Sequence, residues 1–326
     1  MKALVVRELS EDLSGVVLAD VAEPVRAPGQ VLIRVAAASL NFPDLLMTRG
    51  GYQLKPPLPF TPGMEVAGEV IAADADGPTR VGERVVVGTR LGGFAELVTA
   101  DARAVRPIPA GMDAAQAASI GAAYLTAYVA LVRLGGLAPG QWVLVHGASG
   151  GVGLAAVDLA KAMGAQVIAT SRSAEKLAVI AADYAPAATL TTGGGFREQV
   201  LALTGGGADL VYDPVGGDVF DESARCVAFG GKLLVIGFTS GRIPTIAANY
   251  PLIKGFSIVG VRAGEYGRRF PERGRENSDA VWRMAGEGRL KPRIHARMPL
   301  ADWRDAFTEM AEGRIVGKVV LCPAGC

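Results

Sequence analysis

The chain has 326 residues, of which 33 are Lys or Arg and 32 are Asp or Glu, so its formal net charge is only +1. This length favours two domains, because single hydrophobic cores stop growing below it. The balanced charge argues against nucleic acid and anionic membranes as partners, since both are bound through clustered excess Lys and Arg. Half of the residues are apolar, which is too many for a disordered chain.

The N-terminal part, up to about residue 109, predicts a small, mainly antiparallel β domain. Its N-terminus reaches Glu8 after a short apolar run, so it lacks the features of a signal peptide and predicts a first strand. Half-buried strands are expected at 30–40, 65–73, 84–88 and 94–100. Asn41 or Phe42 is the expected cap of a helix that has Pro43 in its first turn and ends at Gly50 and Gly51.

Residues 114–132 form an uncharged stretch that is long enough to span a membrane. Its alanines and polar residues make it too weakly apolar for that environment, so we expect one buried, Ala-rich helix and no membrane anchor. The three cysteines, Cys226, Cys322 and Cys326, form no Cys-x-x-Cys pair. Such scattered cysteines are typical of reduced thiols in a cytoplasmic protein.

The middle of the chain predicts a doubly wound parallel sheet. Apolar strands expected at 142–146, 166–170, 210–213, 232–238 and 257–261 are separated by helices, and strands that are apolar on both faces are typical of a parallel sheet covered on both sides. After residue 264 the chain turns polar, which favours a solvated helix face. Trp303, Ala306, Phe307 and Met310 predict an amphipathic helix, and residues 318–322 predict a last strand.

A dinucleotide site is predicted where the strand at 142–146 runs into a glycine-rich turn and then a helix. The pattern is the dinucleotide fingerprint with Ala in place of its first Gly. In such a site the helix N-terminus directs unpaired N–H groups at the cofactor phosphates. The residues of the turn and first helical positions are Ala148, Ser149, Gly150, Gly151, Val152 and Gly153.

Two other interpretations of this turn stay open. It can be a plain glycine-rich tight turn. It also matches the nucleophile elbow of α/β-hydrolases, because Gly147, Ser149 and Gly151 have the required spacing. A hydrolase needs a later His, and His295 is the only one that follows.

The end of the second strand of the parallel sheet predicts NADPH rather than NADH as cofactor. An acidic residue at this place binds the ribose 2′-hydroxyl of NAD. Here the chain has Ser171 and Arg172 instead, with Lys176 one turn later. A guanidinium, an ammonium and a hydroxyl suit a 2′-phosphate.

Over nearly its whole length the chain resembles the medium-chain dehydrogenase/reductase superfamily, and within it the zinc-independent quinone oxidoreductases related to zeta-crystallin. The resemblance rests on SLNFPDLLMTRGGY, PFTPGMEVAGEV, GGFAELV, VLVHGASGGVGLAAVDLAKAMGAQVIAT and GKVVL. It implies an α/β fold with a GroES-like, mainly antiparallel β catalytic domain at 1–125 and 264–326. A Rossmann domain with a doubly wound parallel sheet, at 126–263, is implied to bind NADPH. A homodimer is also implied.

The resemblance also implies a site without metal. Zinc-dependent members carry a Cys and a His-Glu pair at positions that match Asn41, Met64 and Glu65 here. One remaining carboxylate cannot hold Zn²⁺, which takes three or four protein ligands. Hydride transfer without a Lewis acid suits a quinone or an α,β-unsaturated carbonyl compound, because a delocalised enolate needs only one or two hydrogen bonds.

The resemblance implies roles for several further residues. Asn41 would lie beside the nicotinamide, and Tyr52 would face the acceptor, where related enoyl thioester reductases carry a proton-donating Tyr. An ordinary turn aromatic is the alternative for Tyr52. The cofactor would also be contacted by Thr126, Gly237, Phe238 and Arg314. Relatives often contact the adenosine with a Tyr after the third Rossmann strand, and this chain lacks it.

The sequence therefore predicts an NADPH-dependent, zinc-independent oxidoreductase acting on a small-molecule quinone or enone. An enoyl thioester reductase is the nearest alternative. An α/β-hydrolase and a non-catalytic NADPH-binding protein are alternatives of other classes.

Overall fold

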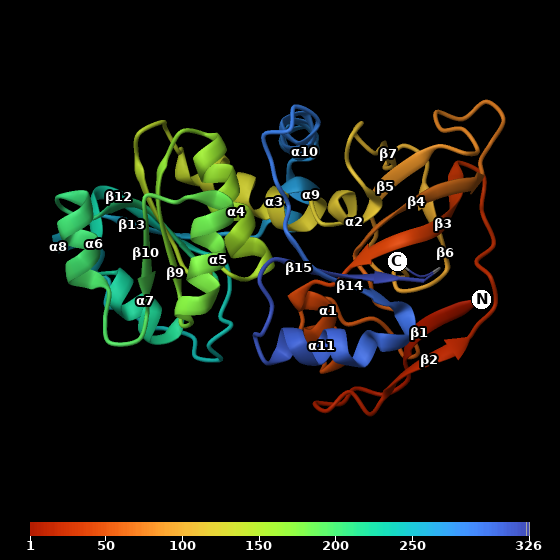
Figure 1. Cartoon of the computed structure of the whole chain (residues 1–326), viewed down its shortest axis with the longest axis horizontal. Helices are drawn as coiled ribbons and strands as arrows, with labels where there is room; N and C mark the ends of the chain where they lie inside the picture. The colour runs from red at the N-terminus through yellow and green to blue at the C-terminus, as the bar shows by residue number, and fades with distance from the viewer. Residues whose placement is uncertain (324, 326) are drawn as a thin grey trace. The chain divides into compact units, whose positions relative to one another are not determined.

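The computed structural model describes residues 1–323 and 325 and divides into two compact units (Figure 1). The first contains Met1–Ala122 and Pro292–Cys326, and the second contains Ala123–Lys291. The first boundary lies close to the expected one at 126. The second lies at 292, not at 264, so residues 264–291 join the second unit.

This correction has a physical cause. Helices α9 (Ala263–Arg269) and α10 (Pro271–Gly286) pack against each other, and α9 also packs against the π-helical turn η1 (Val129–Gly135). The Arg133 side chain of η1 donates hydrogen bonds to Asn277 and Glu276 of α10. The sequence predicted that the polar residues after 264 form a solvated helix face. Two of them, Glu276 and Asn277, instead attach α10 to the second unit.

The first unit is a mainly antiparallel β domain, as predicted. Its seven-stranded sheet has the order β14-β15-β3-β4-β5-β7, with β6 also paired to β3, and β1 and β2 form a separate sheet. Among the described strands of this unit, only β14 and β15 pair in parallel. Its elements are β1 (Lys2–Val6), β2 (Val16–Asp20), β3 (Gln30–Ser39), α1 (Phe42–Thr48), β4 (Glu65–Ala72), β5 (Arg84–Gly88), β6 (Leu97–Asp101), β7 (Arg106–Pro107), α2 (Ala114–Ala118), β14 (Ile294–Pro299), a 3₁₀ turn (Leu300–Asp302), α11 (Trp303–Ala311) and β15 (Lys318–Cys322).

Helix α1 forms where the sequence predicted it. Asn41 is its N-cap, Pro43 lies in the first turn, and the Asn41 backbone N–H donates to the Asp44 carboxylate at 2.9 Å. Pro43 costs no hydrogen bond there, because the first helical N–H groups have no partner inside the helix. The helix ends before Gly50, which has a φ of 72°.

The second unit is a six-stranded parallel sheet in the order β10-β9-β8-β11-β12-β13. Numbered within the unit, this is 3-2-1-4-5-6, the order typical of dinucleotide-binding sheets. Its further elements are α3 (Gly121–Tyr128), β8 (Trp142–Val145), α4 (Gly151–Ala162), β9 (Gln166–Ser171), α5 (Ala174–Tyr184), β10 (Ala188–Thr191), α6 (Arg197–Thr204), β11 (Ala208–Asp213), α7 (Gly217–Ser223), β12 (Val227–Val235), α8 (Asn249–Lys254) and β13 (Ser257–Gly260).

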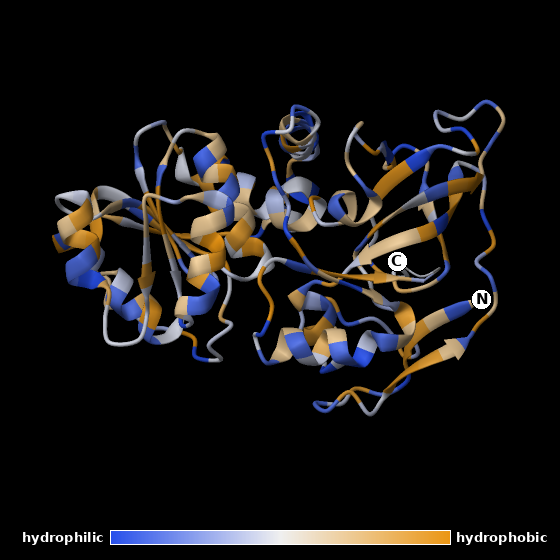
Figure 2. Ribbon diagram, viewed as in Figure 1, coloured by the Kyte–Doolittle hydropathy of each residue, from blue (hydrophilic) through white to orange (hydrophobic). Residues whose placement is uncertain are grey.

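Each unit has its own apolar core, built from the faces that the periodicity predicted. Figure 2 shows hydrophobic colouring along the central strands of the second unit and alternating hydrophobic and hydrophilic segments on α11. In α11 the residues Trp303, Ala306 and Phe307 are buried against the core of the first unit. Burial of such side chains, at about 1.5–3 kcal/mol each, is the main contribution to the stability of these elements.

Two expectations are wrong in detail. Residues 114–132 do not form one helix but are divided among α2, α3 and η1, with a break after Ala118. Cys322 is disulfide-bonded, whereas Cys226 is a buried, free thiol, so the expectation of reduced cysteines fails for Cys322. Cys326 lies outside the described residues. Within the described part of the chain, every helix is too short or too polar to cross a membrane.

Candidate active site and dinucleotide site

The glycine-rich turn of the second unit connects β8 to α4 with the geometry of a phosphate loop. Gly147 has a φ of 55°, a conformation that favours glycine. A Cβ on Gly153 would lie 2.1 Å from the carbonyl oxygen of Gly147, so only glycine lets the helix pack this closely on the turn. Gly150 is the N-cap, and the N–H groups of Gly151, Val152 and Gly153 have no partner inside the helix. They can bind phosphate oxygens.

This loop lies at the switch point of the sheet, between β8 and β11. Ligands of doubly wound sheets bind outside the carboxyl ends of the strands at this point. The turn after β11 packs on the loop, because a Cβ on Gly147 would lie 3.3 Å from Pro214 and Val215. Asp213 holds that turn by accepting the N–H groups of Val215 and Gly216 at 2.8 and 2.9 Å. Burial raises the pKa of the Asp213 carboxyl.

A buried histidine after β8 forms hydrogen bonds with β9 and α7 next to the loop. His146 bonds the Thr170 hydroxyl through Nδ1 and the Ser223 hydroxyl through Nε2, both at 2.7 Å. Burial lowers the pKa of His146 to about 3, so the ring is neutral. Ser223 donates its own proton to the Val219 carbonyl at 2.6 Å. Nε2 therefore carries the proton of the imidazole, and Nδ1 accepts from Thr170.

Positive charge collects at the end of β9. Arg172 is exposed and forms no ion pair or hydrogen bond with another described residue. Burial, and then the charge of Arg172, lower the pKa of Lys176. Ser171 is buried, and its hydroxyl accepts the Ser173 N–H at 3.3 Å. The carboxylate of the neighbouring Glu175 accepts the Ser173 hydroxyl at 2.6 Å. Two cations close enough for the charge of Arg172 to lower the pKa of Lys176 fit a bound 2′-phosphate.

The other predicted cofactor residues are distributed over both units. Ala148 is fully buried, and its N–H donates to the Thr170 carbonyl at 3.0 Å. Ser149 is half-buried in the loop, and Thr126 is half-buried on α3. Gly237 and Phe238 follow β12, and the Phe238 side chain is 40 % exposed. Arg314 belongs to the first unit, where it pairs with Glu312. Their contacts with NADPH stay predictions.

The first unit holds a buried polar cluster around Asn41. The register that pairs Val320 of β15 with Ser39 of β3 puts Lys318 opposite Asn41. On the other side of β3, Ala38 pairs with Val66, which brings Glu65 next to both. The Lys318 ammonium donates to the Asn41 Oδ1 at 2.6 Å and lies 3.4 Å from the Glu65 Oε1. Asn41, Glu65 and Lys318 are each less than a tenth exposed.

Every polar atom of Asn41 and Glu65 in this cluster has a partner. The Asn41 Nδ2 donates to the Glu65 Oε1 at 3.1 Å and to the Ser39 carbonyl at 3.2 Å. The Glu65 Oε2 accepts the Ala122 N–H at 2.5 Å. Both N–H groups of the Asn41 amide thus already donate hydrogen bonds within the first unit. Its predicted role as a donor to the acceptor requires that one of these bonds be replaced.

Asp44 is, after Glu65, the second carboxyl group that is hydrogen-bonded to Asn41, and it is fully buried. Its oxygens accept the N–H groups of Asn41 and Gly63 at 2.9 and 3.0 Å. Burial raises the pKa of Asp44 to about 7, although both N–H bonds and the Lys318 charge lower it. Near neutral pH this carboxyl is therefore partly protonated.

Tyr52 differs from Asn41, because its hydroxyl forms no hydrogen bond with the described residues. The ring is half-buried and packs against the apolar core of the first unit. The hydroxyl is thus available to an acceptor. The role of Tyr52 as proton donor or binding residue stays a prediction.

The hydrolase interpretation finds no support in the surroundings of His295. Its Nδ1 accepts the Val316 N–H at 3.3 Å, and its Nε2 lies 3.6 Å from a carboxylate oxygen of Glu309. Both ring nitrogens thus face partners within the first unit, so the ring is not free to act as a base.

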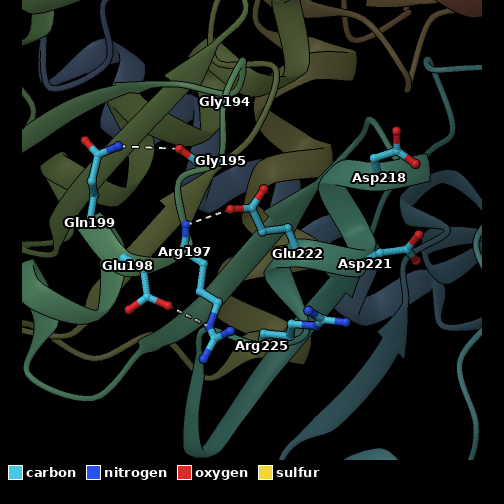
Figure 3. Close-up of a pocket in the computed structure, with 9 residues that line it drawn as sticks. All are labelled: Gly194, Gly195, Arg197, Glu198, Gln199, Asp218, Asp221, Glu222 and Arg225. Carbon is cyan, nitrogen blue, oxygen red and sulfur yellow. Dashed lines mark hydrogen bonds and ion pairs between the residues drawn. The ribbon is translucent and has the colours of Figure 1, made fainter.

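A separate hollow in the second unit contains none of the predicted cofactor residues (Figure 3). Two arginines and four carboxylates line it, on Arg197, Glu198, Asp218, Asp221, Glu222 and Arg225. Glu222 accepts the N–H groups of Phe196 and Arg197 at the start of α6, and Arg242 pairs with Asp218 and Asp221. All four carboxylates and Arg197 thus have partners within the protein, and we assign no ligand to this hollow.

Comparisons with known proteins agree with this geometry. The family model of the alcohol dehydrogenase GroES-like domain matches residues 27–110, and that of the zinc-binding dehydrogenases matches residues 151–278. The chain is 39 % identical to the quinone oxidoreductase-like protein 2 homolog of Nematostella vectensis over 297 residues, which is 90 % of this chain and 81 % of that protein.

Two solved structures share the whole fold. A probable oxidoreductase from Mycobacterium abscessus has a TM-score of 0.90 and 36 % identity, with 99 % of both chains covered. The quinone oxidoreductase of Thermus thermophilus, solved alone and with NADPH, has a TM-score of 0.86 and 33 % identity, with 99 % of this chain and 100 % of that chain covered.

The chain belongs to the medium-chain dehydrogenase/reductase superfamily, in its zinc-independent quinone oxidoreductase branch. Its first unit is the GroES-like domain and its second unit is the Rossmann domain. It is an NADPH-binding oxidoreductase.

The residues at the zinc-ligand positions do not fit a zinc ion. Asn41 and Glu65 already hydrogen-bond each other and contact the Lys318 ammonium, so their oxygen atoms face the charge of Lys318 instead of a metal ion. Met64 is packed against the apolar core. No cluster of three or more His, Cys, Asp or Glu side chains suited to a metal occurs in the described part of the chain.

Sequence reasoning missed Lys318, Asp44 and His146 as parts of the sites. A single Lys at the head of the apolar strand KVVLC was the one available signal for Lys318. Such a charge is expected to be paired when its strand is buried.

Proposed function

We propose that this NADPH-dependent oxidoreductase transfers hydride to a quinone or to an α,β-unsaturated carbonyl compound. The observation that carries the proposal is the buried cluster of Asn41, Glu65 and Lys318 at the positions that hold zinc in zinc-dependent members. The place of a Lewis acid is taken by an ammonium that is already paired with Glu65. An isolated ketone would concentrate negative charge on one oxygen, whereas a conjugated acceptor spreads it, so one or two hydrogen bonds suffice.

NADPH, when bound, supplies the hydride. The N–H groups at the start of α4 and the cations Arg172 and Lys176 would hold its phosphates. Tyr52 would orient the acceptor through its unpaired hydroxyl. The Thermus thermophilus relative, a quinone oxidoreductase, supports a quinone as the acceptor.

The test is a screen of NADPH oxidation by the purified chain against quinones, enones, enoyl-CoA esters and saturated ketones, each with and without a chelator. We expect turnover of quinones or enones that the chelator leaves unchanged. Turnover of saturated ketones alone, lost with the chelator, would contradict the proposal. NADPH binding without turnover of any acceptor would favour a non-catalytic binding protein. Labelling of Ser149 by a fluorophosphonate would favour a hydrolase.

An enoyl thioester reductase is the second candidate, and the free hydroxyl of Tyr52 favours it. After hydride transfer to a thioester, the α-carbon must be protonated, and a positioned acid contributes about a hundredfold or more. Tyr52→Phe should then lower kcat about a hundredfold on an enoyl-CoA ester. On a quinone the oxygens take protons from water, and the hydroxyl contributes one hydrogen bond worth about 1 kcal/mol. The loss should then stay below about tenfold.

The measurement is kcat of wild type and Tyr52→Phe on one quinone, one enone and one enoyl-CoA ester. Tyr250→Phe, on α8 of the second unit, is the control. A hundredfold loss confined to the thioester, with the thioester as best substrate, would replace the first candidate by the second.

A further inference from the structure

The buried cluster of Asn41, Glu65 and Lys318 forms a closed triangle of interactions. The ammonium contacts the amide oxygen at 2.6 Å and the carboxylate at 3.4 Å, and the amide nitrogen contacts the same carboxylate oxygen at 3.1 Å. The shortest contact joins Lys318 to the oxygen of Asn41. The amide is thus held most firmly at its oxygen end.

These charges fix the orientation of the Asn41 amide. A flipped amide would direct its NH₂ group at an ammonium and its oxygen at a carboxylate, and both contacts would be repulsive. Without Lys318 the amide would keep only the two longer donor contacts, to Glu65 at 3.1 Å and to Ser39 at 3.2 Å. A charge-assisted hydrogen bond is about twice as strong as a neutral one, so the ammonium sets the orientation.

The pair is not needed to form the strands that carry it. A buried ion pair contributes little net stability compared with apolar residues of similar size, whereas removing one partner leaves an uncompensated charge. β15 and β3 are already joined by backbone hydrogen bonds, including that from the Leu40 N–H to the Val319 carbonyl at 2.9 Å. A role at the site explains why a charged Lys heads an otherwise apolar strand.

We propose that Lys318 is a positioning residue of the reductase site, which acts by holding the Asn41 amide in one orientation. In this role the ammonium, and not a metal, organises the corner of the site next to the acceptor. This inference rests on the proposed function, because it assigns Asn41 to the acceptor site.

The test uses three variants of Lys318 and one control to separate positioning of the amide from simple charge compensation. Lys318→Met leaves Glu65 buried and unpaired, and it can fail to fold. The double variant Lys318→Met/Glu65→Gln removes both charges, so it is expected to fold, but it still lacks the anchor of the amide. Lys318→Arg keeps the charge. Lys2→Met, which removes a lysine from an exposed pair with Asp20 in the same unit, is the matched control.

One readout does not depend on activity. The chain has only three asparagines, Asn41, Asn249 and Asn277, so selective ¹⁵N-asparagine labelling gives three side-chain NH₂ signals. Asn41→Ala identifies the signal of Asn41. We expect this signal to shift and broaden in the double variant, to stay near its place in Lys318→Arg, and to be unchanged in Lys2→Met.

The second readout is kcat on the best acceptor together with the dissociation constant of NADPH. We expect the double variant to lose about tenfold or more in kcat with unchanged NADPH binding, and to lose little more when Asn41→Ala is added. Recovery of kcat to within about twofold of wild type in the double variant would overturn the proposal. An unmoved Asn41 signal would also overturn it. If wild type turns over no acceptor, the proposed function fails, while the NMR signal still decides the positioning.

Discussion

At the scale of single residues, we propose that Arg172 sets the preference for NADPH over NADH. Arg172 is an exposed cation at the end of β9 with no ion pair or hydrogen bond to another described residue. Burial, and then the charge of Arg172, lower the pKa of the neighbouring Lys176. A bound 2′-phosphate would relieve this repulsion. We therefore expect the preference for NADPH to depend on this guanidinium more than on the fold of the loop.

Arg172→Ala should therefore reduce the preference for NADPH over NADH. Losing a charge-assisted contact with a phosphate costs about 1.5–3 kcal/mol, so kcat/KM for NADPH should fall tenfold or more while that for NADH changes little. The measurement is kcat/KM for both cofactors. Arg225→Ala, in the hollow of the same unit, is the control. An unchanged ratio in Arg172→Ala would contradict this assignment.

Asp44 makes the stability of the protein depend on pH. Burial raises its pKa from 3.8 to about 7 in the folded chain, so the folded state holds the proton more tightly than the unfolded state. Its favourable contribution is complete below pH 3.8 and is lost as the pH rises towards 7. In this window the free energy of unfolding should fall by up to about 1.4 kcal/mol per pH unit through this group.

Asp44→Asn removes this titration and isolates the effect. The measurement is urea denaturation of both proteins from pH 4 to 8. The free energy of unfolding of the wild type minus that of the variant should fall as the pH rises from 4 to 7. A difference that is constant with pH would show that the carboxyl does not titrate in this range.

At the level of elements, the strand–turn–helix unit of β8 and α4 combines fold and function. Gly153→Ala would place a methyl group 2.1 Å from the Gly147 carbonyl oxygen, so α4 must move away from the turn. Overpacking of this kind costs about 1–3 kcal/mol. Because the same N–H groups are to bind the phosphates, NADPH affinity should fall together with stability.

Thermal unfolding and NADPH titration of Gly153→Ala check this. Gly88→Ala is the matched control, because a Cβ at Gly88 has no atom within 4 Å. If the Gly153→Ala variant were less stable but kept full NADPH affinity, the prediction would be wrong, because phosphate binding would then not depend on how closely α4 packs on the turn.

At the level of the whole molecule, the second unit exposes an apolar sheet edge. β13 is the last strand of its sheet, and Ile258 on it is 36 % exposed. Leu252 and Ile253 on α8 are 81 % and 72 % exposed, and the 89 % exposed ring of Phe229 lies against Gly255. An unpaired edge beside such a patch is suited to pairing with another strand.

We propose that a second copy of the chain covers this edge in a two-fold symmetric dimer, which would continue the sheet across the axis. Light scattering after size exclusion should give a dimer for wild type and a monomer for Leu252→Glu/Ile253→Glu. Val25→Glu, at an exposed apolar residue of the first unit, is the control. A wild-type monomer at micromolar concentration would contradict the proposal.

The features that the sequence predicted well are local ones. The cap at Asn41 with Pro43, the alternation of β3, and the loop from Gly147 to Gly153 each depend on residues a few positions apart, so periodicity, caps and glycines specify them. The charge at Arg172 and Lys176 is local in the same way. The long Ala-rich stretch was less predictable, because a single glycine, Gly121 at the start of α3, is the one local signal of the break after Ala118.

The tertiary structure decided what depends on distant segments. Lys318 meets Asn41 only because β15 returns from the end of the chain to lie beside β3, in a register that motifs do not encode. The commitment of both Asn41 amide protons, the raised pKa of Asp44 and the attachment of α10 to the second unit follow from the same kind of contact. Local sequence sets backbone conformation, whereas burial and partner geometry set the protonation and orientation of side chains, and these exist only after the strands have paired.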